Sequence, residues 1–157
     1  MSVQAVRKYL ARFGVDSRIQ EFTESSATVE LAAAVVGVIP ARIAKTLSFK
    51  DGDGAMLVVA AGDAKVDNRK FKDTFGFKAK MLSSGDELEL VGHPVGGVCP
   101  FALKDGVKVY LDVSLQRFDT VFPAAGSSSS AVELSCDELY ECSGAEKWVD
   151  VCKLPDA

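Results

Sequence analysis

Apolar residues near the start of the chain recur with the spacing of an amphipathic helix. Val3, Val6 and Leu10 lie three or four positions apart. This spacing predicts a helix over residues 3–13 that ends at Gly14, because apolar residues so spaced share one helix face and glycine commonly ends a helix.

A second predicted helix is rich in alanine and has suitable residues at both ends. Thr28 favours the N-cap position, Glu30 lies in the first turn, and Gly37 suits the helix end. Pro40 favours the first position of a further short helix, which would carry Lys45 near its end.

Two apolar runs, residues 46–49 and 55–61, flank the turn sequence Asp-Gly-Asp-Gly at positions 51–54. Turn-forming residues between two apolar runs predict a β-hairpin, because the turn reverses the chain and lets the runs pair.

The rest of the chain mixes helices and short strands without a regular alternation. A basic helix is predicted over residues 67–75, and Ser84 and Ser135 each have a glutamate three residues later, which is capping-box spacing. The first of these two helices is predicted to run to about residue 91. Short strands are predicted over residues 18–22, 78–81, 107–112, 120–122 and 131–134. The predicted fold class is mixed α/β, of the α+β type, with a substantially antiparallel sheet.

The composition is that of one soluble domain. The chain has 157 residues, of which 48% are hydrophobic and 25% charged, and this predicts a single domain over residues 1–157 with one core. The longest apolar run, residues 31–40, is too short to cross a bilayer, and the N-terminus lacks the apolar core of a signal peptide. We therefore expect a cytoplasmic protein with no membrane partner.

The net charge of −4 argues against tight, non-specific binding of nucleic acid. The charge is unevenly distributed, because residues 65–80 carry six basic and two acidic side chains, whereas residues 133–157 carry seven acidic and two basic ones. The basic stretch is either a solvated helix face or a surface for weak contact with a phosphate backbone. For the second case, the candidate contact residues are Arg69, Lys70 and Lys72.

Four cysteines and one histidine offer no metal-ligand spacing and no catalytic triad. We therefore expect free thiols, no metal and no cofactor. Cys99 suggests a thiol-dependent enzyme, but a cysteine nucleophile needs a base or a lowered pKa. His93 is six residues away, and nothing in the sequence places it beside the sulfur, so this is the least favoured hypothesis.

Two distant segments carry the most specific signal. Residues 43–47 (Ile-Ala-Lys-Thr-Leu) place one lysine in an apolar stretch, and residues 96–101 (Gly-Gly-Val-Cys-Pro-Phe) form a glycine-rich loop that exposes backbone. A partly buried cation facing backbone groups suits a small, polar ligand that bears an acyl group. It does not suit a metal, a flavin or a nucleoside triphosphate.

These segments belong to a longer ordered series of motifs. The series is Ala-Ala-x-x-x-Gly-Val at 32–38, Ile-Ala-Lys-Thr-Leu at 43–47, Leu-Val-Val-Ala-Ala-Gly-Asp at 57–63, Val-Asp at 66–67, Gly-x-x-x-Gly-Gly-Val-x-Pro-Phe at 92–101, Tyr-Leu-Asp at 110–112, Phe-Asp at 118–119 and Ala-Gly at 125–126. In this order and spacing the chain resembles the YbaK family, also called the prolyl-tRNA-synthetase-associated or aminoacyl-tRNA editing domain, over nearly its whole length.

The resemblance implies a fold and an activity. The implied fold is a compact domain with a large mixed, partly barrel-like sheet flanked by helices. The implied activity is hydrolysis in trans of the ester between a wrong, small amino acid and the 3′ end of a tRNA, often a proline tRNA. Alanine, cysteine, serine and threonine are all open as substrates, and an aminoacyl-tRNA synthetase is a candidate partner.

The resemblance also implies roles for residues of both segments. Lys45 matches the family's lysine, which would grip the terminal adenosine and fix the ester. The other interpretation is a surface lysine at a helix end. In the loop, Gly96, Gly97, Val98 and Pro100 would present backbone to the substrate, Gly97 through a catalytic carbonyl or amide. The other interpretation is a plain turn.

Further candidate residues lie at strand ends and in a serine-rich loop. Gly62 and Asp63 follow an apolar strand and Asp112 ends another, so each either borders the pocket or stabilises a turn. After Gly126 the chain has four serines, where the family can carry other polar residues such as histidine. Gly126, Ser127 and Ser128 are the candidate pocket residues there, or else part of a flexible polar turn. This difference from the family leaves the identity of the substrate amino acid open, but it does not change the implied reaction.

The favoured hypothesis is therefore an aminoacyl-tRNA deacylase. The alternative is a binding module of the same fold that holds a nucleotide, an aminoacyl ligand or a synthetase without turnover. The sequence leaves open whether water or a ribose hydroxyl attacks the ester.

Overall fold

A long antiparallel hairpin forms the centre of the computed structural model, which describes residues 2–94 and 96–155. Strand β2 (Ile43–Asp51) pairs with β3 (Gly54–Ala61), in register from Asp51 opposite Gly54 to Ala44 opposite Ala61. The predicted hairpin is confirmed. Gly52 turns the chain with a φ of +60°, a backbone conformation that glycine adopts without strain.

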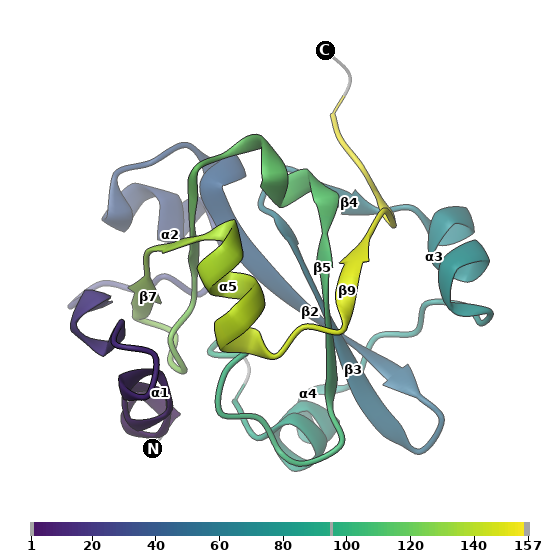
Figure 1. The fold of residues 1–157 in the computed structure, drawn as a ribbon, viewed down its shortest axis with the longest axis horizontal. Coiled ribbons are helices and arrows are strands. Elements are labelled where there is room, and N and C mark those ends of the chain that lie inside the picture. Colours follow the sequence, from purple (N-terminus) through teal and green to yellow (C-terminus); the bar gives the residue numbers. More distant parts are fainter. Residues whose placement is uncertain (1, 95, 156–157) are drawn as a thin grey trace.

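Four further strands extend the hairpin to a six-stranded sheet in the order β8-β6-β2-β3-β5-β9 (Figure 1). The added strands are β5 (Lys108–Asp112), β6 (Thr120–Pro123), β8 (Leu134–Ser135) and β9 (Lys147–Val149). The pairings β2–β6, β3–β5 and β5–β9 are parallel, whereas β2–β3 and β6–β8 are antiparallel. The expected mixed, partly barrel-like sheet is confirmed, and its longest ladder, between β2 and β3, has the expected antiparallel pairing.

Two short ladders and several helices surround this sheet. The ladders pair β1 (Ile19–Glu21) with β7 (Ser130–Val132) and β4 (Lys65–Val66) with β10 (Cys152–Lys153). The α-helices are α1 (Ser2–Ala11), α2 (Val29–Val36), α3 (Asn68–Phe75), α4 (Ser84–Asp86) and α5 (Cys136–Ser143). Three short 3₁₀ turns span Asp16–Arg18, Pro40–Arg42 and Val113–Arg117, and a π-helical turn spans Glu87–Val91. In Figure 1, α2 and α3 lie at opposite sides of the molecule. Within the described residues, no helix has the length and apolar character needed to cross a membrane.

The predicted helix ends are confirmed where local capping decides them. The Thr28 hydroxyl accepts a hydrogen bond from the Leu31 amide, and Gly37 ends α2 in the left-handed conformation. Ser135 and Glu138 form the predicted capping box at the start of α5. Each of these contacts lies within one helical turn, which is why residue types alone predict it.

Three local predictions are wrong. Lys45 does not end a helix, because the 3₁₀ turn after Pro40 lasts three residues and β2 begins directly after it. Residues 78–81 form no strand beyond a single bridge between Phe49 and Met81. The N-cap of α4 is Ser83 rather than Ser84, since the Ser83 hydroxyl accepts the Asp86 amide. Because of this shift by one residue, the Glu87 side chain takes no part in an N-terminal capping box, and Glu87 lies at the C-terminal end of α4.

Two apolar clusters hold the elements together. In the larger one, every residue of β3 after its first glycine is buried, because the sheet is covered on both faces there. The smaller one joins α2 to the start of β2 and the end of β6 through Ala32, Ala33, Ile43 and Phe122. This smaller cluster fixes the N-terminus of α2 beside the first residues of β2.

We predict that Phe71→Ala destabilises the fold by about 3–5 kcal/mol, the usual cost of truncating a buried phenylalanine. Phe71 is fully buried, and its ring centroid lies 4.8 Å from that of Phe49 and 4.6 Å from that of Phe75. Urea denaturation measures the change. Thr74→Ala, at an exposed position of the same helix, should change the stability by less than about 0.5 kcal/mol. Equal effects of the two substitutions would show that α3 is not anchored through Phe71.

Candidate functional site

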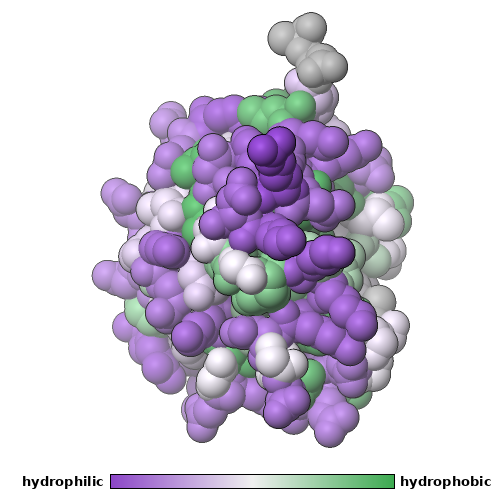
Figure 2. All heavy atoms as spheres, turned by 90° about the vertical axis from the view of Figure 1, so that its right-hand side faces the viewer, coloured by the Kyte–Doolittle hydropathy of each residue, from purple (hydrophilic) through white to green (hydrophobic). Residues whose placement is uncertain are grey.

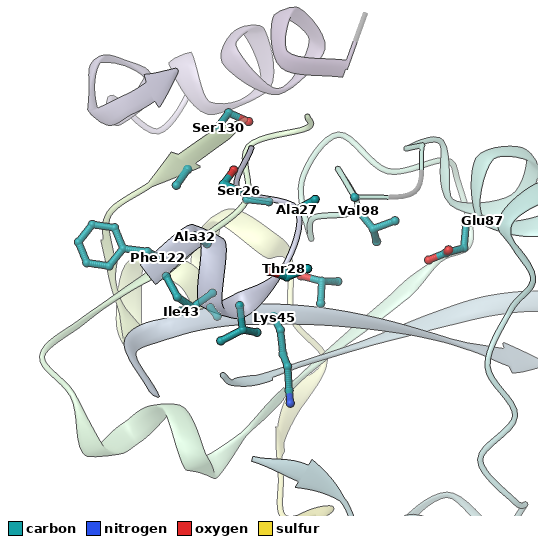
Figure 3. A pocket seen from close by; sticks show the side chains of 16 residues that line it. Ser26, Ala27, Thr28, Ala32, Ile43, Lys45, Glu87, Val98, Phe122 and Ser130 are labelled. Atoms are coloured by element: carbon teal, nitrogen blue, oxygen red, sulfur yellow. The ribbon is translucent and has the colours of Figure 1, made fainter. Parts of the chain in front are cut away.

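A pocket of about 250 Å³ opens between the first residues of β2, the N-terminus of α2 and the glycine-rich loop (Figure 3). We call it the β2–α2 pocket. The smaller apolar cluster forms one wall through Val29, Ala32, Ile43 and Phe122. The other walls have small side chains, including Ala27, Ala44, Ala124 and Ala131. The pocket is smaller than the roughly 300–1,000 Å³ typical of sites for drug-sized ligands, so it suits a small group.

Lys45 is the one cation among the described residues that line the β2–α2 pocket. Its half-buried ammonium donates hydrogen bonds to the carbonyl oxygens of Ala64 and, at 3.5 Å, of Gly62. An ammonium has three N–H donors, so one remains for a ligand. Burial lowers the pKa of Lys45, whereas the Asp63 carboxylate acts in the opposite direction. The two carbonyl oxygens accept N–H bonds and so hold the ammonium in one position at the end of the side chain.

The polar side chains of Ser26, Thr46, Glu87 and Ser130 also line the pocket, and none of them was predicted as a site residue. The hydroxyls of Ser26 and Thr46 are buried and have no hydrogen-bond partner in the described part of the chain. A buried hydroxyl without a partner is costly unless a ligand or water satisfies it. Thr46 stands beside Lys45 in the motif at residues 43–47, but its residue type alone gave no reason to assign it a role. Glu87 was predicted to be a capping residue, and that prediction already explained its carboxylate.

The glycine-rich loop packs directly against the serine-rich loop. Gly96 has a φ of +84° and lines the pocket together with Val98. Gly97 lies behind them and is buried, and a Cβ atom on it would come within 2.9 Å of the Ser127 Cα and 3.0 Å of the Gly126 backbone. The Gly97 amide donates to the Pro94 carbonyl. This amide is therefore engaged, and the backbone that reaches the pocket is that of Gly96 and Val98.

Ser127 and Ser128, the two serines expected at the pocket, do not line it. The Ser128 carbonyl accepts the Ser26 amide at 2.6 Å. The Ser127 hydroxyl donates to the Ser130 hydroxyl at 2.8 Å, and Ser130 is the serine of this run that lines the pocket. Hydrogen bonds therefore order the run, which is not a free polar turn, and Gly126 is buried beneath it.

The candidates at strand ends have structural partners outside the pocket. The Gly62 carbonyl accepts the Lys45 ammonium, and a Cβ atom on Gly62 would lie 2.1 Å from the Pro40 carbonyl oxygen. Asp63 forms an ion pair with Arg117 at 2.6 Å, which lowers the pKa of that carboxyl group. Asp112 is buried and accepts the amides of Ser114 and Val151, both at 2.9 Å. Among these three, only Gly62 contacts a pocket side chain. Pro100 is buried and does not line the pocket.

His93 and Cys99 lie side by side, which the sequence did not predict. The Cys99 sulfur is 3.6 Å from His93 Nε2, and that nitrogen also lies 2.7 Å from the Phe101 carbonyl oxygen. Since a carbonyl only accepts, Nε2 carries the proton and is not available as a base toward the thiol. Burial raises the pKa of Cys99 to about 12 and lowers that of His93. The pair therefore does not generate a thiolate.

The candidate contact residues for tRNA lie on α3, on the other side of the molecule from α2 (Figure 1). The Lys70 ammonium is bound to the Asp150 carboxylate at 3.1 Å and to the Cys152 carbonyl at 3.0 Å. Arg69 and Lys72 are exposed. The surface on this side is largely hydrophilic (Figure 2), which fits either a solvated face or a weak polar contact.

Comparison with known proteins identifies the family. Residues 23–142 match the aminoacyl-tRNA editing domain family. The chain belongs to this family.

No group of three or more histidine, cysteine or acidic side chains that could hold a metal ion occurs in the described ranges.

Three similar proteins place the family assignment in context. An uncharacterised Bacillus subtilis protein, YwhH, is 55% identical over 154 residues, which are 98% of each chain. A proline–tRNA ligase of Bacillus pumilus is 30% identical over 64% of this chain, but the match spans 18% of the ligase. A solved structure described as a candidate trans-editing enzyme for prolyl-tRNA synthetase superposes with a TM-score of 0.87 at 27% identity, over 97% of both chains.

We predict that Gly97→Ala destabilises the protein by about 1–3 kcal/mol, the usual cost of overpacking a well-packed site. The contacts of a new Cβ atom would be backbone atoms of Gly126 and Ser127, which cannot rotate away. Gly85→Ala is the matched control, because Gly85 has no heavy atom within 4 Å of a new Cβ and no positive φ. The control should be neutral or slightly stabilising in urea denaturation. If Gly97→Ala were as harmless, the close packing of the two loops would be wrong.

Proposed function

We propose that the protein is a trans-acting hydrolase that cleaves the ester between a small amino acid and the 3′ end of a mischarged tRNA. The observation that carries the proposal is the β2–α2 pocket, a cavity of about 250 Å³ that combines a fixed ammonium with hydroxyls that have no partner among the described residues. Membership of the aminoacyl-tRNA editing domain family supports it. The proposed compartment is the cytoplasm.

The dimensions of the pocket support a small amino acid. Alanine side chains form much of its wall, and the larger apolar side chains of Phe122, Ile43 and Val29 also line it. A small pocket excludes amino acids with large side chains by steric clash. Between two small amino acids that differ by one methylene group, a pocket discriminates only weakly. Alanine, cysteine, serine and threonine remain the proposed substrates, and the free hydroxyls of Ser26 and Thr46 offer partners for a polar side chain or for the ester itself.

The chemical demand on the site is modest because an aminoacyl ester is already activated. The site must hold the ester, position the attacking group and stabilise the negative charge that develops on the ester oxygen. We assign the electrostatic part to Lys45, whose remaining N–H can contact the ester or the terminal adenosine. Gly96 and Val98 supply the backbone that borders the substrate. The attacking group is either water or the ribose hydroxyl next to the ester, which a 2′-deoxy terminal adenosine would distinguish.

We predict that the protein deacylates one or two of the tRNA species charged with alanine, cysteine, serine or threonine. Lys45→Ala should reduce kcat/KM at least about 100-fold, the usual effect of removing a preorganised donor from an active site. The measurement is release of the labelled amino acid, with prolyl-tRNA included for comparison and a melting curve for each variant. Lys50→Ala, at an exposed position of the same strand, is the matched control and should retain full activity.

Two outcomes would contradict this assignment. Full activity of a folded Lys45→Ala variant would remove the lysine from the mechanism. Absence of turnover with every charged tRNA, by wild-type protein that is folded, would favour a binding module of the same fold.

The proposed contact of α3 with the tRNA body has its own test. We predict that Arg69→Ala combined with Lys72→Ala weakens tRNA binding and reduces the slope of log Kd against log salt by about 0.7–0.9 for each phosphate that the protein no longer neutralises. Lys8→Ala combined with Lys50→Ala removes the same charge from exposed positions elsewhere and should leave the slope unchanged. Equal slopes in both double variants would mean that α3 is only a solvated face.

A further inference from the structure

Glu87 is the one carboxylate among the described residues that line the β2–α2 pocket. It has no lysine, arginine or histidine nitrogen within 4 Å in the part of the chain that the structure describes. A carboxylate that lines a pocket without a cationic partner is free to pair with a cation that enters the pocket. The pocket therefore presents an acidic group that a cationic ligand would stabilise.

The local backbone and one hydrogen bond hold this carboxylate in place. Glu87 begins the π-helical turn that ends at Val91, and π-turns inside helices are frequent at functional sites. The buried Ser48 hydroxyl donates to Glu87 Oε2 at 2.7 Å. This bond engages one carboxylate oxygen and leaves Oε1 for another donor. Figure 3 shows the carboxylate end of Glu87 directed toward the side of the pocket where Thr28 lies.

The two charges of the pocket are separated along it. Glu87 lies at one side and Lys45 extends away from it, toward the Gly62 and Ala64 carbonyls (Figure 3). An aminoacyl ester on a tRNA has the same polarity, because its α-amino group is cationic when protonated and its nucleotide is anionic. Opposite charges attract and like charges repel, so this separation admits one orientation of the ligand.

We propose that Glu87 binds the α-ammonium group of the aminoacyl ester and thereby restricts the pocket to substrates with a free amino group. The inference rests on the proposed function and names the feature of the substrate that the pocket recognises. Glu87 Oε1 accepts a hydrogen bond from the ammonium. The unpartnered Thr46 hydroxyl is a second acceptor on the same pocket lining. The nucleotide then lies toward Lys45.

The test compares alanyl-tRNA with N-acetylalanyl-tRNA, or the corresponding pair for whichever amino acid the wild-type protein releases fastest. Acetylation removes the positive charge of the amine and keeps the ester. Each enzymatic rate is divided by the spontaneous rate of the same ester, since acetylation also changes its reactivity. The wild-type protein should prefer the free amine by about 10- to 100-fold in kcat/KM, the range expected for a hydrogen bond to a charged group.

Glu87→Gln should remove most of this preference, mainly through a higher KM for the free amine, while kcat/KM for the acetylated substrate stays the same or rises. Glutamine retains an oxygen that accepts the Ser48 hydrogen bond, so the fold should be preserved, and a melting curve checks it. Glu87→Asp should recover part of the preference because it restores the charge. Glu89→Gln, an exposed acid two positions away, is the matched control and should behave as the wild type does.

The outcomes separate this inference from the proposed function. Wild-type protein that deacylates both substrates equally would overturn the role of Glu87 and leave the deacylase assignment intact. An undiminished preference in a folded Glu87→Gln variant would do the same. Absence of turnover with every charged tRNA would overturn both.

Discussion

The position of one ammonium group determines how the candidate site is built. Lys45 is half-buried on β2, and burial of a charge is unfavourable unless hydrogen bonds replace its hydration. The carbonyls of Gly62 and Ala64 provide this replacement just beyond the end of β3. They are placed by the β2–β3 pairing, in which Lys45 lies opposite Ala60. The central hairpin therefore fixes the charge in the pocket, and the rest of the site is arranged around it.

The absence of side chains matters as much as their presence around this charge. Gly62 permits the 3₁₀ turn at Pro40 to approach the end of β3, and Gly97 permits the two loops to touch through their backbones. Alanines then line much of the cavity. The site is consequently small and shaped mainly by backbone, with polar groups at a few points. Such a site is suited to hold and orient a small activated ester, which needs positioning and charge stabilisation more than an elaborate set of catalytic side chains.

Contacts within one helical turn or one hairpin could be predicted from the sequence, whereas the pocket depends on long-range pairing. The caps at Thr28 and Ser135 and the turn at Gly52 involve neighbouring residues, so residue type decides them. The start of β2 depends on Ile43 pairing with Phe122, almost eighty positions away, and no local signal indicates it. The short strands β9 and β10 exist only because a partner strand lies beside them. Of the residues that the sequence assigned to the site, Lys45, Gly96 and Val98 line the pocket. Ser26 and Glu87 line it too, but only the folded structure brings them there.

The most direct measurement is the structure of the protein with a non-hydrolysable analogue in which alanine is joined to the 3′ position of adenosine by an amide. We predict that the alanyl group occupies the β2–α2 pocket, with the nucleoside toward Lys45 and the amino group toward Glu87. An analogue bound at another surface, or bound in the pocket with its nucleoside toward Glu87, would contradict the roles assigned to Lys45 and Glu87.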